Sequence, residues 1–151
     1  MAKEKGWKPL PTSLKILFVL TLISIPFSLI GLLSIAKTGY LLLGFQVFGT
    51  GAIILYILSL AATIIFPIGL WNRYHWTAKY GLAYYGFSLL NTLSGMIPTQ
   101  KQIEQQLSQL PAALPGLKEA MYASIIITAI ISIAVTIIFL TIIYKKRDYF
   151  K

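Results

Sequence analysis

The sequence predicts an all-α membrane protein: a bundle of four antiparallel transmembrane helices, with a short amphipathic helix in the outer loop between spans 3 and 4. Four apolar stretches, at about residues 13–36, 40–70, 77–97 and 120–144, are each long enough to cross a hydrocarbon core, which takes about 20 helical residues. Charged residues make up 11% of the chain, whereas about 25% is usual in a soluble domain. Basic residues are dense in alternate connecting segments, as they are in multi-span proteins.

The length leaves room for one domain. With 151 residues and four predicted spans, residues 1–151 form a single membrane domain whose first partner is the lipid bilayer. The net charge of +9 could indicate nucleic acid, but Lys and Arg flank apolar stretches and build no basic face. We therefore expect no nucleic-acid partner. The absence of cysteine excludes disulfides and thiolate metal sites.

The distribution of Lys and Arg predicts the topology. If the N-terminus is cytoplasmic, the inside segments hold Lys3, Lys5, Lys8, Lys15, Arg73, Lys79, Lys145, Lys146, Arg147 and Lys151, whereas the outside segments hold Lys37, Lys101 and Lys118. This split follows the positive-inside rule. We therefore predict a multi-pass protein of the cell membrane with both termini in the cytoplasm.

Residues 13–36 follow a basic lead and contain Pro26, which favours a bend. This segment could instead be a cleaved signal peptide, because Ser34-Ile35-Ala36 resembles a cleavage site. Its apolar run is longer than the usual signal-peptide core, so we expect it to be retained as span 1. The short link at residues 37–39 predicts that spans 1 and 2 form a tight antiparallel pair.

Gln46 and Asn91 are the most polar groups inside the predicted spans. Gln46 lies near the outer end of span 2 and Asn91 near the outer end of span 3, so both should sit in the outer third of the bilayer. An amide without a hydrogen-bond partner is costly in lipid, so we expect them to bond each other or neighbouring groups. The pair is a candidate clamp between helices or, alternatively, the lining of a small polar site.

Aromatic residues crowd the inner half of span 3, at Tyr80, Tyr84, Tyr85 and Phe87. Rings at this spacing more often pack than form a ligand cage. Tyr84 is nevertheless a candidate wall for a lipid chain or an apolar ligand.

The outer loop, residues 99–119, carries an amphipathic pattern. Ile103, Leu107 and Leu110 recur at helical spacing, which predicts a helix over about residues 100–110 before two prolines interrupt it. We expect this apolar face to lie on the membrane surface or across the outer mouth of the bundle as a lid. A plain connector is the other interpretation.

Small residues predict how the helices pack. Span 4 carries Ser124, Thr128, Ser132 and Thr136 at strict four-residue spacing among isoleucines. Close packing of small residues and interhelical hydrogen bonds hold helices together in lipid. The other three spans also offer faces of Gly, Ser and Thr, so the faces predict a compact bundle. One of them could instead serve a homo-oligomer, and the sequence does not allocate them.

The middle of each span contains no Asp, Glu, Lys or Arg, which disfavours several mechanisms. Proton-coupled transport and voltage sensing need such groups. The sequence offers no ligand cluster for zinc, haem or an iron–sulfur centre, and no histidine accompanies the serines at membrane depth. We therefore predict no catalytic residues, no metal, no cofactor and a protein that is not an enzyme.

Two functions remain. The preferred one is a non-catalytic structural or accessory subunit that packs against a larger membrane protein or against itself. It predicts that the Ser124–Thr136 stripe faces lipid. The alternative is a passive conduit, or a binder of lipid or another apolar molecule, with its site on the outer side of the bundle. It predicts a cavity that reaches Gln46 or Asn91.

Overall fold

The computed structural model describes residues 6–7, 10–96 and 116–150, and this part of the chain is mainly helical. Its four helices are α1 (Thr12–Thr38), α2 (Gly49–Asn72), α3 (Thr77–Ser94) and α5 (Leu117–Lys145). Between α1 and α2 lies a β-hairpin in which β1 (Tyr40–Leu42) pairs antiparallel with β2 (Phe45–Val47). A short 3-10 helix, η1 (Arg147–Phe150), follows α5.

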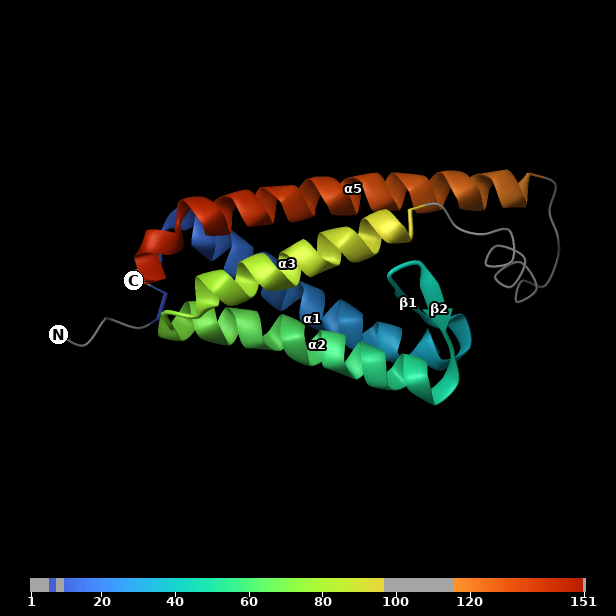
Figure 1. The fold of residues 1–151 in the computed structure, drawn as a ribbon, viewed down its shortest axis with the longest axis horizontal. Helices are drawn as coiled ribbons and strands as arrows, with labels where there is room; N and C mark the ends of the chain where they lie inside the picture. The colour runs from blue at the N-terminus through green and yellow to red at the C-terminus, as the bar shows by residue number, and fades with distance from the viewer. Residues whose placement is uncertain (1–5, 8–9, 97–115, 151) are drawn as a thin grey trace.

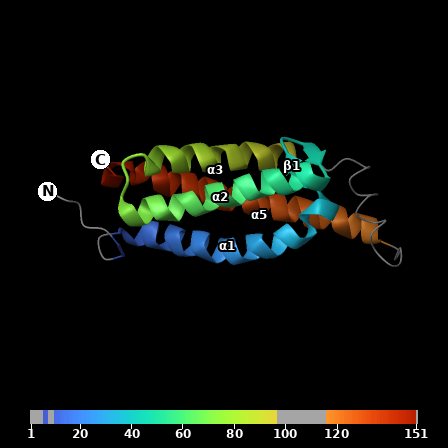
Figure 2. The ribbon, with the colours of Figure 1, turned by 90° about the horizontal axis from the view of Figure 1, so that it is seen from below.

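The helices form two helix pairs. α1 packs closely along α2 and α3 packs closely along α5, whereas α2 with α3 and α1 with α5 make far less contact. Figures 1 and 2 show the four helices alongside one another, with both chain ends at one end and the β-hairpin at the other. α2 and α3 are close at their short connection and diverge toward the β-hairpin (Figure 1). The contacts run in the cyclic order α1, α2, α3, α5.

Three segments are long and apolar enough to cross a membrane: Thr12–Ala36, Gly49–Asn72 and Glu119–Lys145. Large apolar side chains such as Phe27, Leu33 and Ile131 point outward from them, as contact with lipid requires. The prediction of a helical protein is confirmed, and three of its helices fit membrane spans by length and composition. α3 has 18 residues and is not among these segments, because a lysine, an asparagine and several tyrosines lower its hydropathy.

The prediction of a helix from residue 40 is wrong, because residues 40–47 form the β-hairpin and α2 begins at Gly49. The backbone φ is positive at Gly39 (79°), Leu43 (48°), Gly44 (84°) and Gly49 (62°). Residues in this conformation cannot continue a right-handed helix. Leu43 and Gly44 are the two central turn residues, and positive φ at both is the mark of a type I′ turn.

The outer loop is shorter than predicted at its C-terminal side. α5 begins at Leu117, directly after Gly116 in the left-handed conformation, so residues 117–119 are helical. The predicted amphipathic helix, with Ile103, Leu107 and Leu110, lies outside the described residues.

The end that holds both chain termini is closely packed. Its fully buried side chains come from all four helices and η1, and they include Leu14, Phe66, Thr77, Ile143 and Phe150. These residues close the space between the helix pairs at this end.

Arg73 ties the α2–α3 connection to the C-terminal segment. Its guanidinium lies over the Tyr149 ring, 4.1 Å from the centroid, and its Nη2 donates a hydrogen bond to the Tyr149 carbonyl at 3.3 Å. Burial raises the pKa of the Tyr149 phenol, although the Arg73 charge opposes that shift. The ring therefore stays neutral, and the contact is a cation–π interaction.

Candidate functional site

Asn91 joins α3 to the β-hairpin. Its Oδ1 accepts a hydrogen bond from the Leu43 amide at 2.6 Å, and its Nδ2 donates to the Leu41 carbonyl at 3.2 Å. Leu43 is the turn residue that carries a positive φ without being glycine. Backbone groups outside a helix need partners at membrane depth, and the Asn91 amide supplies two of them.

Gln46 lies on β2 and not in a helix, which corrects its predicted place in span 2. Its Nε2 donates to the carbonyl of Thr38, the last residue of α1, at 2.7 Å. Its Oε1 is buried and has no hydrogen-bond partner within the described chain. Gln46 and Asn91 therefore bond different parts of the backbone, and together they connect the end of α1, the β-hairpin and α3.

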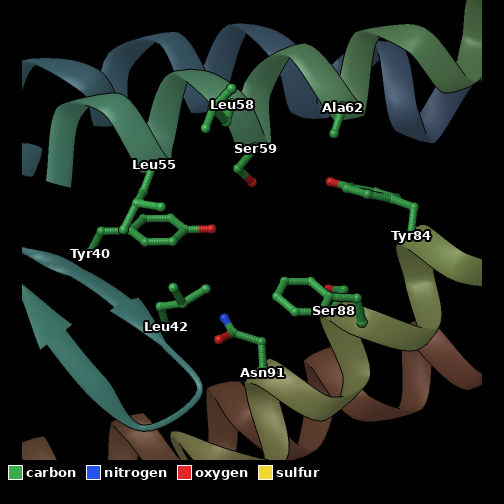
Figure 3. Close-up of a pocket in the computed structure, with 10 residues that line it drawn as sticks. Tyr40, Leu42, Leu55, Leu58, Ser59, Ala62, Tyr84, Ser88 and Asn91 are labelled. Atoms are coloured by element: carbon green, nitrogen blue, oxygen red, sulfur yellow. The ribbon is translucent and has the colours of Figure 1, made fainter. Parts of the chain in front are cut away.

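A cavity of about 300 Å³, the hairpin cavity, lies between the β-hairpin, α2 and α3. Figure 3 shows the hydroxyl groups of Tyr40, Ser59 and Tyr84 directed into it, with the Asn91 amide at its edge. The remaining lining residues are Leu42, Leu55, Leu58, Ala62, Phe87 and Ser88. The cavity reaches Asn91, and Gln46 is not part of its lining.

A larger cavity of about 700 Å³, the central cavity, lies between the two helix pairs. Most of its lining side chains carry a hydroxyl group: Thr21, Ser24, Ser28, Ser59, Thr63, Tyr84, Tyr85, Ser88, Ser132 and Thr136. Leu20, Val135 and Phe139 complete the lining. All four helices contribute, and among the residues that the structure describes no acidic or basic side chain belongs to this lining. The cavity is therefore polar but uncharged.

Tyr84 separates the two cavities. Ser59, Tyr84 and Ser88 line both of them. The Tyr84 hydroxyl lies 2.6 Å from Thr63 Oγ1, so a hydrogen bond between α3 and α2 holds Tyr84 between the two cavities. Tyr84, a candidate ligand wall in the sequence, thus faces a cavity on each side.

Both cavities have apolar rims at the outer surface of the helices. Leu58 and Phe87 line the hairpin cavity and are 61% and 47% exposed, whereas Leu20 and Val135 line the central cavity and are 45% and 41% exposed. The first rim lies between α2 and α3 and the second between α1 and α5. The two openings therefore face opposite sides of the molecule.

Tyr85 closes the central cavity toward the chain termini. Its ring meets Phe66 and Phe139 edge to face, with centroid distances of 5.3 and 5.2 Å. Its hydroxyl lies 3.2 Å from Thr21 Oγ1. The cavity therefore ends against the buried cluster and does not continue to the termini.

The predicted packing stripe of α5 divides into two halves. Thr136 is buried and Ser132 is half-buried, and both line the central cavity. Ser124 and Thr128 are exposed. Only the half nearer the termini therefore faces the other helices.

Ser59 and Thr63 are site residues that the sequence analysis missed. They lie four residues apart, on one face of α2, and this spacing in an apolar helix was the available signal. The corresponding small residues of the other three spans were predicted to pack together. Instead, several of them surround the central cavity.

Comparison with protein-family models, curated proteins and solved structures finds no match for this chain. The chemistry of the two cavities therefore has to follow from their own side chains.

Proposed function

We propose that this protein is a four-span membrane protein that binds a lipid or another largely apolar molecule between its two helix pairs. The observation that carries the proposal is the hairpin cavity, which reaches Asn91 and has a rim of exposed Leu58 and Phe87. An apolar chain can enter from the bilayer through such a rim, while hydroxyl and amide groups inside bind a polar head. The closed end at Tyr85 favours a binder over a passive conduit.

The course of the chain supports four spans. α2 ends near the chain termini, whereas α5 begins at the opposite end of the molecule (Figure 1). α3 connects the two ends, and its 18 residues rise about 27 Å at 1.5 Å each, close to the thickness of a hydrocarbon core. If α1, α2 and α5 cross the bilayer, α3 must return the chain through it. The positive-inside rule then predicts that the protein crosses the cell membrane with both termini in the cytoplasm.

This topology is testable because the chain has no cysteine of its own. Cysteine at exposed His75, before α3, should be labelled by a membrane-impermeant maleimide only after the cells are permeabilised. Cysteine at exposed Glu119, in the first turn of α5, should be labelled in intact cells. Labelling of both positions from the same side would rule out a crossing by α3.

Filling the hairpin cavity should reduce lipid binding. Ala62 lines the cavity, and the neighbouring Ala61 is exposed on the same helix, so Ala62→Leu and Ala61→Leu form a matched pair. In native mass spectra of protein purified in mild detergent, we expect a copurified lipid on the unmodified protein and on Ala61→Leu. The bound fraction on Ala62→Leu should fall at least several-fold, because the leucine occupies the site. The proposal fails if no lipid adduct is found, or if both variants retain it equally.

A second candidate function is the non-catalytic structural or accessory subunit. The exposed Ser124 and Thr128 favour it, because they leave the outer half of the α5 stripe free to meet another membrane helix. The same spectra distinguish the two functions. A mass of two copies of the chain, or of one copy with a larger membrane protein, would favour the subunit.

A further inference from the structure

Several hydroxyl groups of the central cavity donate their hydrogens to carbonyl oxygens within the protein. Thr21 donates to the Leu17 carbonyl at 2.8 Å, and Ser24 donates to the Thr21 carbonyl at 2.7 Å. Thr136 on α5 likewise donates to the Ser132 carbonyl, at 2.7 Å. A Ser or Thr hydroxyl has a single hydrogen and two acceptor lone pairs. Toward a ligand in the cavity, these hydroxyl oxygens can therefore act only as hydrogen-bond acceptors.

Because each hydroxyl group has one hydrogen, the donor in the two tyrosine contacts can be identified in the same way. Thr63 donates its hydrogen to the Ser59 carbonyl at 2.9 Å, so Tyr84 must be the donor in the 2.6 Å contact with Thr63. Thr21 is committed to Leu17, so Tyr85 must be the donor in the 3.2 Å contact with Thr21. Both phenol oxygens then keep free lone pairs.

The cavity consequently presents more acceptors than donors. Ser28 also donates within its own helix, to the Ser24 carbonyl at 2.9 Å. The hydroxyls of Ser59, Ser88 and Ser132 can rotate to either role. An uncharged site of this kind matches a ligand that brings its own hydrogen-bond donor.

We propose that the central cavity binds the head of a neutral lipid alcohol, a long-chain molecule with a free hydroxyl group. This inference rests on the proposed lipid-binding function, and it adds the central cavity as a second site beside the hairpin cavity, with the chemical class of its ligand. The hydroxyl donates to the acceptors around Tyr84, Tyr85 and Thr136, and the chain leaves between Leu20 and Val135 into the bilayer.

Charged lipids fit this site poorly. An ionised carboxylate has only acceptors, so it would meet the acceptor oxygens of the lining without a donor from the ligand. An ammonium brings donors, but no carboxylate of the described residues lines the cavity to balance its charge. A neutral alcohol brings a hydrogen-bond donor and carries no charge that needs a partner.

The test compares two ligands with the same chain and the same oxygen, in which a methyl group replaces the hydrogen that the alcohol can donate. Purified protein in mild detergent is titrated with 1-hexadecanol and with hexadecyl methyl ether, and the rise of the unfolding temperature gives the apparent affinity. We expect the alcohol to bind about tenfold more tightly, because the ether oxygen has no hydrogen to donate. Palmitate at neutral pH should bind more weakly than the alcohol.

A matched pair of variants locates the effect. Thr136 and Thr141 both donate to a carbonyl four residues earlier on α5, but Thr136 lines the cavity and Thr141 is exposed. Thr136→Val should weaken binding of the alcohol several-fold and leave the ether unchanged. Thr141→Val should change neither.

The outcomes separate this inference from the proposed function. If the alcohol and the ether bind equally well, or the ether binds better, the acceptor-lined site is wrong while lipid binding stands. If neither raises the unfolding temperature and no lipid copurifies, both proposals fail. An alcohol preference that Thr136→Val leaves intact would overturn the assignment to this cavity.

Discussion

Asn91→Leu should lower the free energy of unfolding by about 2 kcal/mol, because it removes the link between α3 and the β-hairpin. Two backbone groups, the Leu43 amide and the Leu41 carbonyl, lose their side-chain partner. A backbone group left without a partner typically costs about 1–3 kcal/mol, and water at the membrane surface recovers part of that. Thermal unfolding in mild detergent should show a fall of several degrees in Tm.

Asn72→Leu is the matched control. Asn72 is also partly buried, but its amide donates to the Ile68 carbonyl of its own helix, at 3.0 Å, and within the described residues it bonds no other element. Its replacement should change the stability by no more than about 0.5 kcal/mol. Equal losses for the two variants would mean that Asn91 does not hold the β-hairpin.

The apolar helices could be predicted because length and hydropathy are properties of each segment by itself. Length and hydropathy alone identify Thr12–Ala36, Gly49–Asn72 and Glu119–Lys145 as candidate spans, and no tertiary contact is needed. The β-hairpin could not be found in this way. An apolar strand and an apolar helix have the same hydropathy, and only the positive φ of the turn separates them here. Gln46 was consequently placed in the wrong element.

The cavities depend on distances that no single segment determines. Small residues on one face of each span were visible in the sequence, and they predicted close packing. In the structure, tyrosine hydroxyls of α3 reach across to the first helix pair: Tyr80 donates to the Ala62 carbonyl at 2.8 Å, and Tyr85 reaches Thr21. Rings of this length hold the helix pairs apart at the level of Thr21 and Thr63, so small residues there line a space. The sequence shows the tyrosines but not which helix each one meets.

The buried end should not tolerate added volume, and two glycines of α3 test this. A Cβ atom at Gly81 would lie 2.5 Å from Phe66 Cε2 and 3.0 Å from Ile143 Cδ1. At Gly86, no heavy atom of the described residues lies within 4 Å of the added Cβ, apart from the adjacent residues and backbone of its own helix. Both positions are inside the same helix, so the two Gly→Ala changes have the same effect on helix propensity.

Gly81→Ala is expected to destabilise the protein by about 1–3 kcal/mol, because Phe66 and Ile143 are fully buried and cannot move aside without disturbing the cluster that closes the molecule. Gly86→Ala should instead stabilise it by about 0.5–1 kcal/mol, the usual gain for alanine over glycine in a helix. The two Tm values, measured in the same detergent, should therefore move in opposite directions. A gain for both variants would show that α3 does not pack against α2 and α5 at Gly81, and the closed end that favours a binder over a conduit would be lost with it.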